Sequence, residues 1–332
     1  MTDTTASTDQ IGPPPPYDPE LAESAAVFAE VMPSPTTPNL ISAFRSGPTG
    51  VEPSSGDELS RGGEFQIFER TVPGPAGESD ITLLVCRPTG ASAPTPAIYA
   101  MHGGGMILGD RRTNLPDMVD LAASVGAAVI SVEYRLAPEH PHPAPIEDCY
   151  AGLVWVAANA TELNIDPGRL VVAGASSGGG LAAAVALLAR DRGGPELAGQ
   201  LLLAPMLDDR DDTPSVRQMA SRDMWDHTLM DSGWTALLGD ARGGPDVSPY
   251  AAPARATDLS GLPPAFIYGG SVETVRDEDV AYASAIWRAG GQAELHVWSG
   301  GFHGFDLMAP QAAVSQAAKA ARTSWMRRIV KV

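Results

Sequence analysis

The sequence is poor in cysteine, in positive charge and in long apolar runs. It has two cysteines, Cys86 and Cys149, among 332 residues, too few for a disulfide framework. Its 22 Lys and Arg residues are outnumbered by 40 Asp and Glu residues, so the net charge is −18. Such an acidic surface repels nucleic acid and anionic lipid, so we expect neither nucleic acid nor a membrane as a partner, and polyanionic substrates are disfavoured.

Signals for export or membrane insertion also do not occur in the sequence given. The chain begins Met1-Thr2-Asp3-Thr4-Thr5, without the basic and apolar regions of a signal peptide, and no apolar run reaches about 20 residues. We therefore expect a cytoplasmic protein. Cys86 and Cys149 lie in a strand-like and a helix-like run, which is typical of buried thiols.

The first 55 residues differ in composition from the rest. Residues 1–20 are rich in Thr, Asp and Pro, which predicts a loose or polyproline-like arm, and apolar residues at helical spacing predict a helix over 20–32. Residues 36–63 are rich in Pro, Gly and Ser. We interpret 1–55 as an N-terminal arm and cap segment, and 56–332 as the catalytic domain.

Strands and helices alternate from residue 64 onward. Strands are predicted at 65–72, 81–87, 96–101, 127–134, 170–173, 200–204, 265–269 and 293–298. Helices are predicted at 115–125, 144–164, 178–190, 280–289 and 311–330. An initial hairpin followed by this alternation predicts an α/β fold with a mostly parallel sheet covered on both faces. Residues 206–255 interrupt the pattern and are interpreted as a helical cap insertion.

A candidate nucleophile lies between one predicted strand and helix, in Gly174-Ala175-Ser176-Ser177-Gly178. A G-x-S-x-G turn in this context presents Ser176 as a nucleophile, and its glycines let strand and helix approach closely. The alternative is a Gly/Ser turn that binds phosphate at the start of a helix.

A glycine loop, His102-Gly103-Gly104-Gly105, follows the strand at 96–101. Ligands of parallel sheets bind beyond the carboxyl ends of strands, and consecutive glycines let backbone N–H groups point into such a site. Gly104 and Gly105, together with the N–H of Ser177, are the candidate oxyanion-hole donors. A phosphate loop is the alternative, although no Lys or Thr follows. We expect the ring of His102 to shape the loop through hydrogen bonds.

The candidate base is His303, in the glycine-flanked segment after the last strand. From there its ring can reach Ser176 and take the hydroxyl proton. Glu273 follows the strand at 265–269 closely and is the preferred acid, in the expected chain order of serine, acid, histidine. Asp277, predicted in the first turn of the next helix with a capping or dipole role, is the alternative acid. A purely structural role for His303 is the other interpretation.

Four motifs in this order resemble the hormone-sensitive-lipase family (bacterial family IV type) of α/β-hydrolase-fold carboxylesterases. They are His102-Gly103-Gly104-Gly105, Tyr134-Arg135-Leu136-Ala137-Pro138-Glu139, Gly174-Ala175-Ser176-Ser177-Gly178-Gly179 and His303-Gly304-Phe305. The resemblance covers about residues 64–330. It implies an eight-stranded sheet, Ser176 as nucleophile, His303 as base, the glycine loop as oxyanion hole and a cap built from the N-terminal segment and the insertion.

This chain departs from the family pattern at several positions. Glu273 replaces the usual Asp of the family's D-P-L-x-D-E run, and the proline is absent. Ala175 and Ser177 flank the serine where Asp and Ala are frequent. Met106 follows the glycine loop where an aromatic residue is common, which predicts a more adaptable acyl pocket.

These observations together predict a serine carboxylesterase that acts on small-molecule esters of short to medium chain through an acyl-enzyme, without cofactor or metal. A lactonase, amidase or dehydratase with the same residues is an alternative, as is a non-catalytic ligand-binding protein. Family analogy also suggests a homodimer. Six apolar cap residues would either line the substrate pocket or pack the cap onto the core: Phe28, Met32, Phe44, Trp225, Met230 and Trp234.

Overall fold

One eight-stranded sheet forms the centre of the molecule, as predicted. The computed structural model describes residues 11–31, 41, 45, 54–220 and 225–332. The strands are β1 (Phe65–Val72), β2 (Ile81–Pro88), β3 (Thr95–Met101), β4 (Ala128–Glu133), β5 (Ile165–Ala175), β6 (Gly199–Leu203), β7 (Ala265–Val272) and β8 (Ala293–Phe302). Their order is β1-β2-β4-β3-β5-β6-β7-β8. β1 and β2 form the expected antiparallel hairpin, β2 is antiparallel to β4, and the pairs from β4 to β8 are parallel.

Helices cover both faces of this sheet and one of its ends. They are α1 (Ala22–Val31), α3 (Gly56–Ser60), α4 (Leu115–Val125), α5 (Ala144–Ala158), α6 (Ala160–Leu163), α7 (Ser177–Asp191), α8 (Pro214–Ala220), α9 (Trp225–Leu238), α10 (Arg276–Arg288), α11 (Phe305–Met308) and α12 (Ala313–Val330). Short 3₁₀ turns lie at η1 (Arg61–Gly63), η2 (Gly239–Ala241) and η3 (Pro253–Arg255). In the part of the chain described, no helix is long and apolar enough to cross a membrane.

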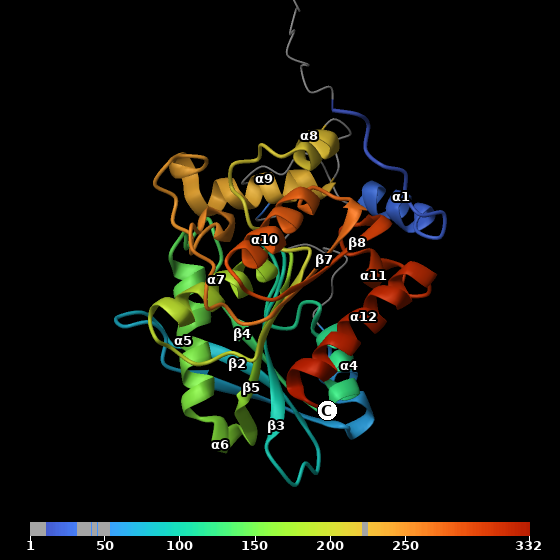
Figure 1. The fold of residues 1–332 in the computed structure, drawn as a ribbon. Coiled ribbons are helices and arrows are strands. Elements are labelled where there is room, and N and C mark those ends of the chain that lie inside the picture. Colours follow the sequence, from blue (N-terminus) through green and yellow to red (C-terminus); the bar gives the residue numbers. More distant parts are fainter. Residues whose placement is uncertain (1–10, 32–40, 42–44, 46–53, 221–224) are drawn as a thin grey trace, which may run out of the picture.

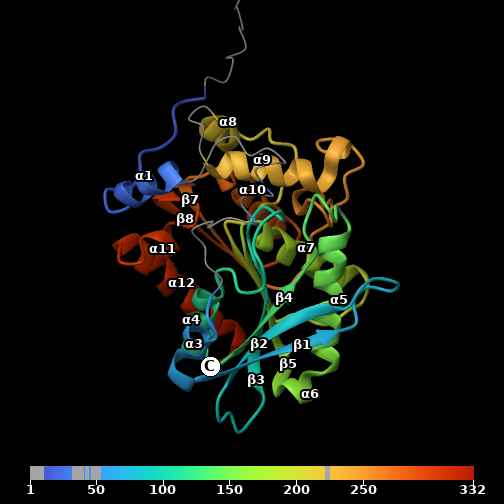
Figure 2. The same cartoon turned by 180° about the vertical axis from the view of Figure 1, so that it is seen from behind.

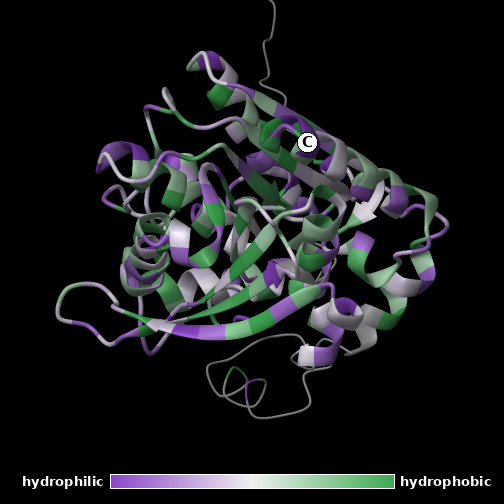
Figure 3. Cartoon of the chain, turned by 90° about the horizontal axis from the view of Figure 1, so that it is seen from below, coloured by the Kyte–Doolittle hydropathy of each residue, from purple (hydrophilic) through white to green (hydrophobic). Residues whose placement is uncertain are grey.

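The two helical layers are visible from opposite sides in Figures 1 and 2. α5, α7 and α10 lie on one face, and α4 and α12 lie on the other. Each layer encloses its own apolar core against the sheet. Figure 3 shows hydrophobic residues concentrated between the layers and hydrophilic residues on the outer loops and helix surfaces. Burial on both faces explains why the central strands read as continuous apolar runs.

α7 is the helix that carries the candidate site into the core. Its residues from Ser177 to Ala189 are all buried, and most of them are Gly, Ala or Leu. Small side chains let this helix lie directly on the sheet, between β5 and β6 on one side and α5 on the other. The residue at its N-terminus is thereby fixed against the carboxyl ends of the central strands.

The structure differs from the sequence-based predictions at several element boundaries; for example, β5 begins at Ile165 rather than at residue 170 and β7 continues to Val272. The helix predicted at 144–164 is two helices, because the chain leaves helical geometry at Asn159. α10 begins at Arg276 rather than at residue 280. β8 continues to Phe302, so residues expected to form a loop belong to the strand that ends directly before His303.

Of the two forms predicted for the N-terminal arm, the loose one is wrong at Tyr17 and Asp18, although residues 11–18 form no helix or strand; residues 1–10 lie outside the described chain. The N–H of Asp18 donates to the carbonyl of Gly300 at 3.1 Å, and the ring of Tyr17 meets the ring of Phe302 edge to face at 6.0 Å. These two contacts dock the arm onto the end of β8. The Pro-rich composition gave no sign of them, because they depend on one aromatic side chain and one backbone hydrogen bond.

The insertion at 206–255 contains α8 and α9, which lie over the carboxyl ends of the strands (Figure 1). α9 contacts the glycine loop directly, since a Cβ atom at Gly233 would lie 2.3 Å from the carbonyl oxygen of Gly105. This segment therefore covers the end of the sheet where the candidate residues gather.

Candidate active site

Ser176 lies on a strained turn between β5 and α7. Its backbone has φ 57° and ψ −125°, a conformation that residues other than glycine rarely adopt. The N–H of Ser176 donates to Leu203 O at 2.9 Å, and its carbonyl accepts from Met206 N at 3.0 Å. These bonds hold the strained turn, and a serine at the tip of a strand–turn–helix is the geometry of a nucleophile elbow.

The glycines of the turn are required by close backbone approach. A Cβ atom at Gly178 would lie 2.1 Å from Met101 O, at the end of β3. A Cβ atom at Gly174 would lie 2.1 Å from Gly178 O. Both contacts are far inside van der Waals distance, so no larger residue fits at either position without moving the turn.

The glycine loop packs against this turn. A Cβ atom at Gly103 would lie 3.5 Å from the Cβ of Ser176, so loop and serine are immediate neighbours. Gly104 and Gly105 have φ of 114° and 63°, and Gly104 O accepts the N–H groups of Ile107 and Leu108. Within the described chain, the N–H groups of Gly104 and Gly105 have no acceptor. They are therefore available to a ligand at Ser176.

His102 supports the loop, as the sequence led us to expect. Its Nδ1 lies 2.8 Å from Gly103 O, its ring stacks on Tyr134 at 4.2 Å, and the Tyr134 hydroxyl donates to His102 O at 2.7 Å. Burial lowers the pKa of His102, so the ring is neutral at neutral pH. The neutral ring donates from Nδ1 to Gly103 O and so stabilises the glycine loop. This arrangement does not make His102 the base for Ser176.

Glu273 and His303 form a buried pair at the carboxyl ends of β7 and β8. Nδ1 of His303 lies 2.7 Å from Oε2 of Glu273, and the two residues are 7% and 1% exposed. The other carboxylate oxygen, Oε1, accepts the N–H of Gly270. The carboxylate thus orients the imidazole through Nδ1.

Asp277 is not brought to His303. It lies in the first turn of α10, and its carboxylate accepts the N–H of Ser215 at 2.8 Å and Nε of Arg276 at 2.7 Å. Ser215 N belongs to the first turn of α8, so Asp277 caps that helix instead of its own. Of the two candidate acids, the geometry pairs Glu273 with the histidine.

The hydroxyl of Ser176 is not engaged in this structure. Its Oγ is buried and has no hydrogen-bond partner among the described residues. Catalytic hydrogen bonds are often long in a resting site and shorten only with substrate bound. Ser176, Glu273 and His303 follow β5, β7 and β8, whose carboxyl ends share one edge of the sheet.

The described apolar side chains of the cap are buried in the core. Met230 and Trp234 are 3% and 2% exposed and belong to the same apolar cluster as Met106, which is 1% exposed. Of the two roles expected for Met230 and Trp234, the structure shows packing of the cap onto the core. Met106 is a core residue as well. Met32, Phe44 and the side chains of Phe28 and Trp225 lie outside the described part of the structure.

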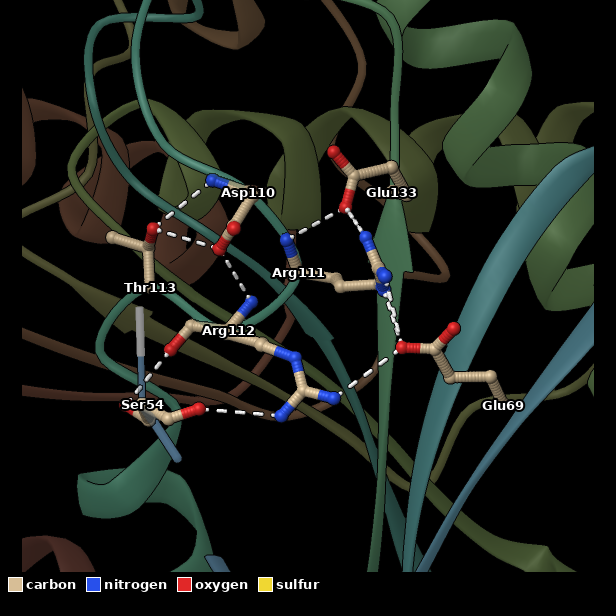
Figure 4. Close-up of polar contacts among 7 residues, drawn as sticks. All are labelled: Ser54, Glu69, Asp110, Arg111, Arg112, Thr113 and Glu133. Atoms are coloured by element: carbon tan, nitrogen blue, oxygen red, sulfur yellow. Dashed lines mark hydrogen bonds and ion pairs between the residues drawn. The ribbon is translucent and has the colours of Figure 1, made fainter. Parts of the chain in front are cut away.

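A polar cluster that sequence reasoning missed anchors the segment after the glycine loop (Figure 4). Arg111 lies 2.8 Å from the carboxylates of both Glu69 on β1 and Glu133 on β4, and its N–H donates to Glu133. Arg112 donates to Ser54 O, which links this segment to the chain before α3. The two consecutive arginines, six and seven residues after Gly105, were the available signal in the sequence.

Arg45 was also missed, and it ties the N-terminal segment to the same loop. Its guanidinium donates to Ile107 O at 2.6 Å and to Ala137 O at 2.5 Å, and it pairs with Glu139 at 2.7 Å. The carbonyls that it binds lie next to Met106, whose own carbonyl accepts Ala137 N. No composition or periodicity signal singles out this arginine.

Among the described residues, no cluster of three or more His, Cys, Asp or Glu side chains is arranged to hold a metal ion. A buried elbow serine, a glycine loop with unused N–H groups and a histidine held by a carboxylate, all at one edge of a mostly parallel eight-stranded sheet, define the class as the α/β-hydrolase fold.

Comparison with known proteins gives the family. A family model described as alpha/beta hydrolase fold matches residues 98–307. Carboxylesterase NlhH of Mycobacterium tuberculosis (strain ATCC 25618 / H37Rv) is 41% identical over 259 residues, which cover 75% of this chain and 79% of that protein. Esterase LipI of the same strain is 36% identical, covering 73% of this chain and 75% of its own length.

Solved structures agree. One described as a bacterial heroin esterase superimposes with a TM-score of 0.84 at 36% identity and covers 95% of this chain and 98% of its own. The chain belongs to the α/β-hydrolase family and is of the hormone-sensitive-lipase type that its motifs resemble.

Proposed function

We propose that this protein is a serine carboxylesterase in which Ser176, His303 and Glu273 form the catalytic triad. The observation that carries the proposal is the buried 2.7 Å contact between Glu273 Oε2 and His303 Nδ1, beyond the carboxyl ends of β7 and β8 and on the same side of the sheet as the elbow serine. Relatives of 41% and 36% identity bear the names carboxylesterase and esterase, which supports the same reaction class here.

The proposed reaction begins with attack of Ser176 Oγ on the ester carbonyl. His303 Nε2 takes the hydroxyl proton, and Glu273 stabilises the resulting imidazolium through Nδ1–H. The carbonyl oxygen gains negative charge, which the N–H groups of Gly104, Gly105 and Ser177 stabilise. His303 then returns the proton to the leaving alcohol, and an acyl-enzyme remains.

Hydrolysis of the acyl-enzyme follows the same path in reverse. Water donates its proton to His303 as it attacks the acyl carbonyl, the same N–H groups stabilise the oxyanion, and Ser176 leaves with the proton from His303. Every step uses residues of this chain and needs no cofactor.

We further propose a preference for esters of short to medium chain. α9 lies directly on the glycine loop at Gly233, and Met106, Met230 and Trp234 are buried, so these side chains leave little surface for a long acyl group. The net charge of −18 disfavours polyanionic substrates.

The test is hydrolysis of p-nitrophenyl esters from acetyl to decanoyl by wild type, Ser176→Ala and His303→Ala. Exposed residues of the same types supply the controls Ser124→Ala and His140→Ala, which should retain wild-type rates. Both site variants should lose at least about 10³-fold in kcat, as triad removal does elsewhere. Wild-type turnover by either site variant would refute the proposal. A parallel panel of lactones and amides distinguishes an esterase from the alternative hydrolases.

A further inference from the structure

A second carboxyl group lies beside the candidate triad acid. Asp279, in the first turns of α10, is 1% exposed, and both of its carboxyl oxygens are buried without a hydrogen-bond partner among the described residues. Native proteins rarely leave buried polar atoms unsatisfied, so this group needs an explanation. No role for Asp279 follows from the triad alone.

Gly269 on β7 places this carboxyl group next to Glu273. A Cβ atom at Gly269 would lie 2.8 Å from Oε1 of Glu273 and 3.0 Å from Oδ2 of Asp279. The two carboxyl groups therefore share the space that the missing side chain leaves open. Oε1 is the oxygen of Glu273 that does not contact His303, and it already accepts the N–H of Gly270.

Two negative charges cannot both be stable in this space without a cation. Burial raises the pKa of Asp279 well above its usual value, and Glu273 and Glu278 raise it further. Burial also raises the pKa of Glu278 well above its usual value. The carboxyl group of Glu278 accepts the N–H of Leu207. The third titratable group on this helix face is Tyr282, whose pKa burial also raises.

Arg217 on α8 and Arg288 in α10 are exposed to solvent, and three further arginines around α10 are paired with other carboxylates. These pairs are Arg190–Asp191 from α7, Arg255–Asp209 at η3 and Arg276–Asp277 in α10 itself. Asp208, after β6, pairs with Arg210. His303 faces Glu273 from the end of β8. The group that can relieve the repulsion between Asp279 and Glu273 is thus a proton on Asp279 itself.

We propose that Asp279 is a positioning residue for the catalytic triad, a neutral carboxylic acid whose O–H is directed at Oε1 of Glu273. This inference rests on the proposed function. With donors from Gly270 and Asp279 on Oε1, the carboxylate of Glu273 is fixed in orientation while Oε2 holds His303. Asp279 does not touch substrate and acts through Glu273.

The test compares Asp279→Asn with Asp279→Leu through the pH profile of kcat/KM. The acid limb of this profile reports protonation of the essential base, here His303. Asn is nearly isosteric, is neutral and retains a donor, so its acid limb should coincide with that of wild type and kcat should stay within about threefold. Leu removes the donor, so more negative charge remains at Oε2 to stabilise protonated His303; the acid limb should move to higher pH, and kcat should fall about tenfold because Glu273 is no longer fixed in orientation.

Two outcomes would overturn the inference. If Asp279→Asn moves the acid limb to lower pH, Asp279 carries a negative charge in the wild type, because removing that charge lowers the pKa of His303. If Asp279→Leu has the same profile and kcat as Asp279→Asn, no hydrogen bond to Glu273 exists. Thermal melts of both variants identify any loss that comes from unfolding.

A second measurement does not depend on ester hydrolysis. The infrared difference spectrum of wild type minus Asp279→Asn at neutral pH should contain the C=O band of a protonated carboxyl group, and its absence refutes the inference. Lack of ester hydrolysis by the wild type would instead refute the proposed function, while the infrared band would still decide the protonation state of Asp279.

Discussion

The identity of the triad acid gives the sharpest single prediction. Glu273→Gln keeps the size of the side chain but removes the charge that faces His303 Nδ1 at 2.7 Å in a buried site. The imidazolium formed during attack then has no counter-charge, and the amide favours the wrong tautomer. Loss of the acid in other triads lowers kcat by about 10³- to 10⁴-fold, or about 4–5.5 kcal/mol in barrier height.

Asp277→Asn is the matched comparison, since it neutralises a carboxylate only four residues away, in the first turn of α10. Asp277 contacts Ser215 N and Arg276 rather than His303, so we expect kcat within about threefold of wild type and a stability loss of about 1 kcal/mol. Initial rates on p-nitrophenyl acetate, with urea unfolding of each variant, make the measurement. A larger loss of kcat in Asp277→Asn than in Glu273→Gln would refute the assignment.

Two further predictions concern stability. Gly300→Ala should destabilise the fold by at least about 1 kcal/mol more than Gly290→Ala, because both glycines have positive φ but only at Gly300 would a Cβ meet another group, 2.1 Å from Asp18 N; equal losses in urea would contradict docking of the arm. Asp117→Asn should cost about 3 kcal/mol, because buried Arg322 loses its near carboxylate at 2.6 Å and keeps only Asp306 at 4.0 Å. Burial would raise the pKa of Asp117, but Arg322 outweighs it and lowers the pKa. The pair therefore stabilises the fold above the unfolded-state pKa of about 3.9, and the difference between variant and wild type should shrink as pH falls through the folded pKa. A pH-independent difference would contradict this.

Most strands and helices could be predicted from local patterns in the sequence. β1 and α4 have the bounds that periodicity predicts, because an edge strand alternates and an amphipathic helix ends at a glycine, here Gly126 with φ 63°. Central strands were recognised as apolar runs between turn residues. The glycines around Ser176 pointed to a close backbone approach, and the structure contains it at Gly174 and Gly178.

Contacts between residues far apart in the sequence could not be predicted, because no local pattern indicates them. The arm looked loose by composition, yet Tyr17 and Asp18 dock on the end of β8. Composition could not decide whether Met230 and Trp234 line a pocket or pack the cap onto the core, and the structure places both in the core cluster. Asp279 lay unremarked near the start of a predicted helix, because only the packing of α10 against β7 reveals that it is buried and unpaired beside Glu273.

The most direct test of the central claim is to trap the acyl-enzyme. Wild-type protein is mixed with p-nitrophenyl acetate, quenched in acid during turnover and digested for mass spectrometry. One acetyl group is predicted on the peptide that contains Ser176, with none in Ser176→Ala. Acetylation at another residue, or steady turnover by Ser176→Ala, would contradict the account.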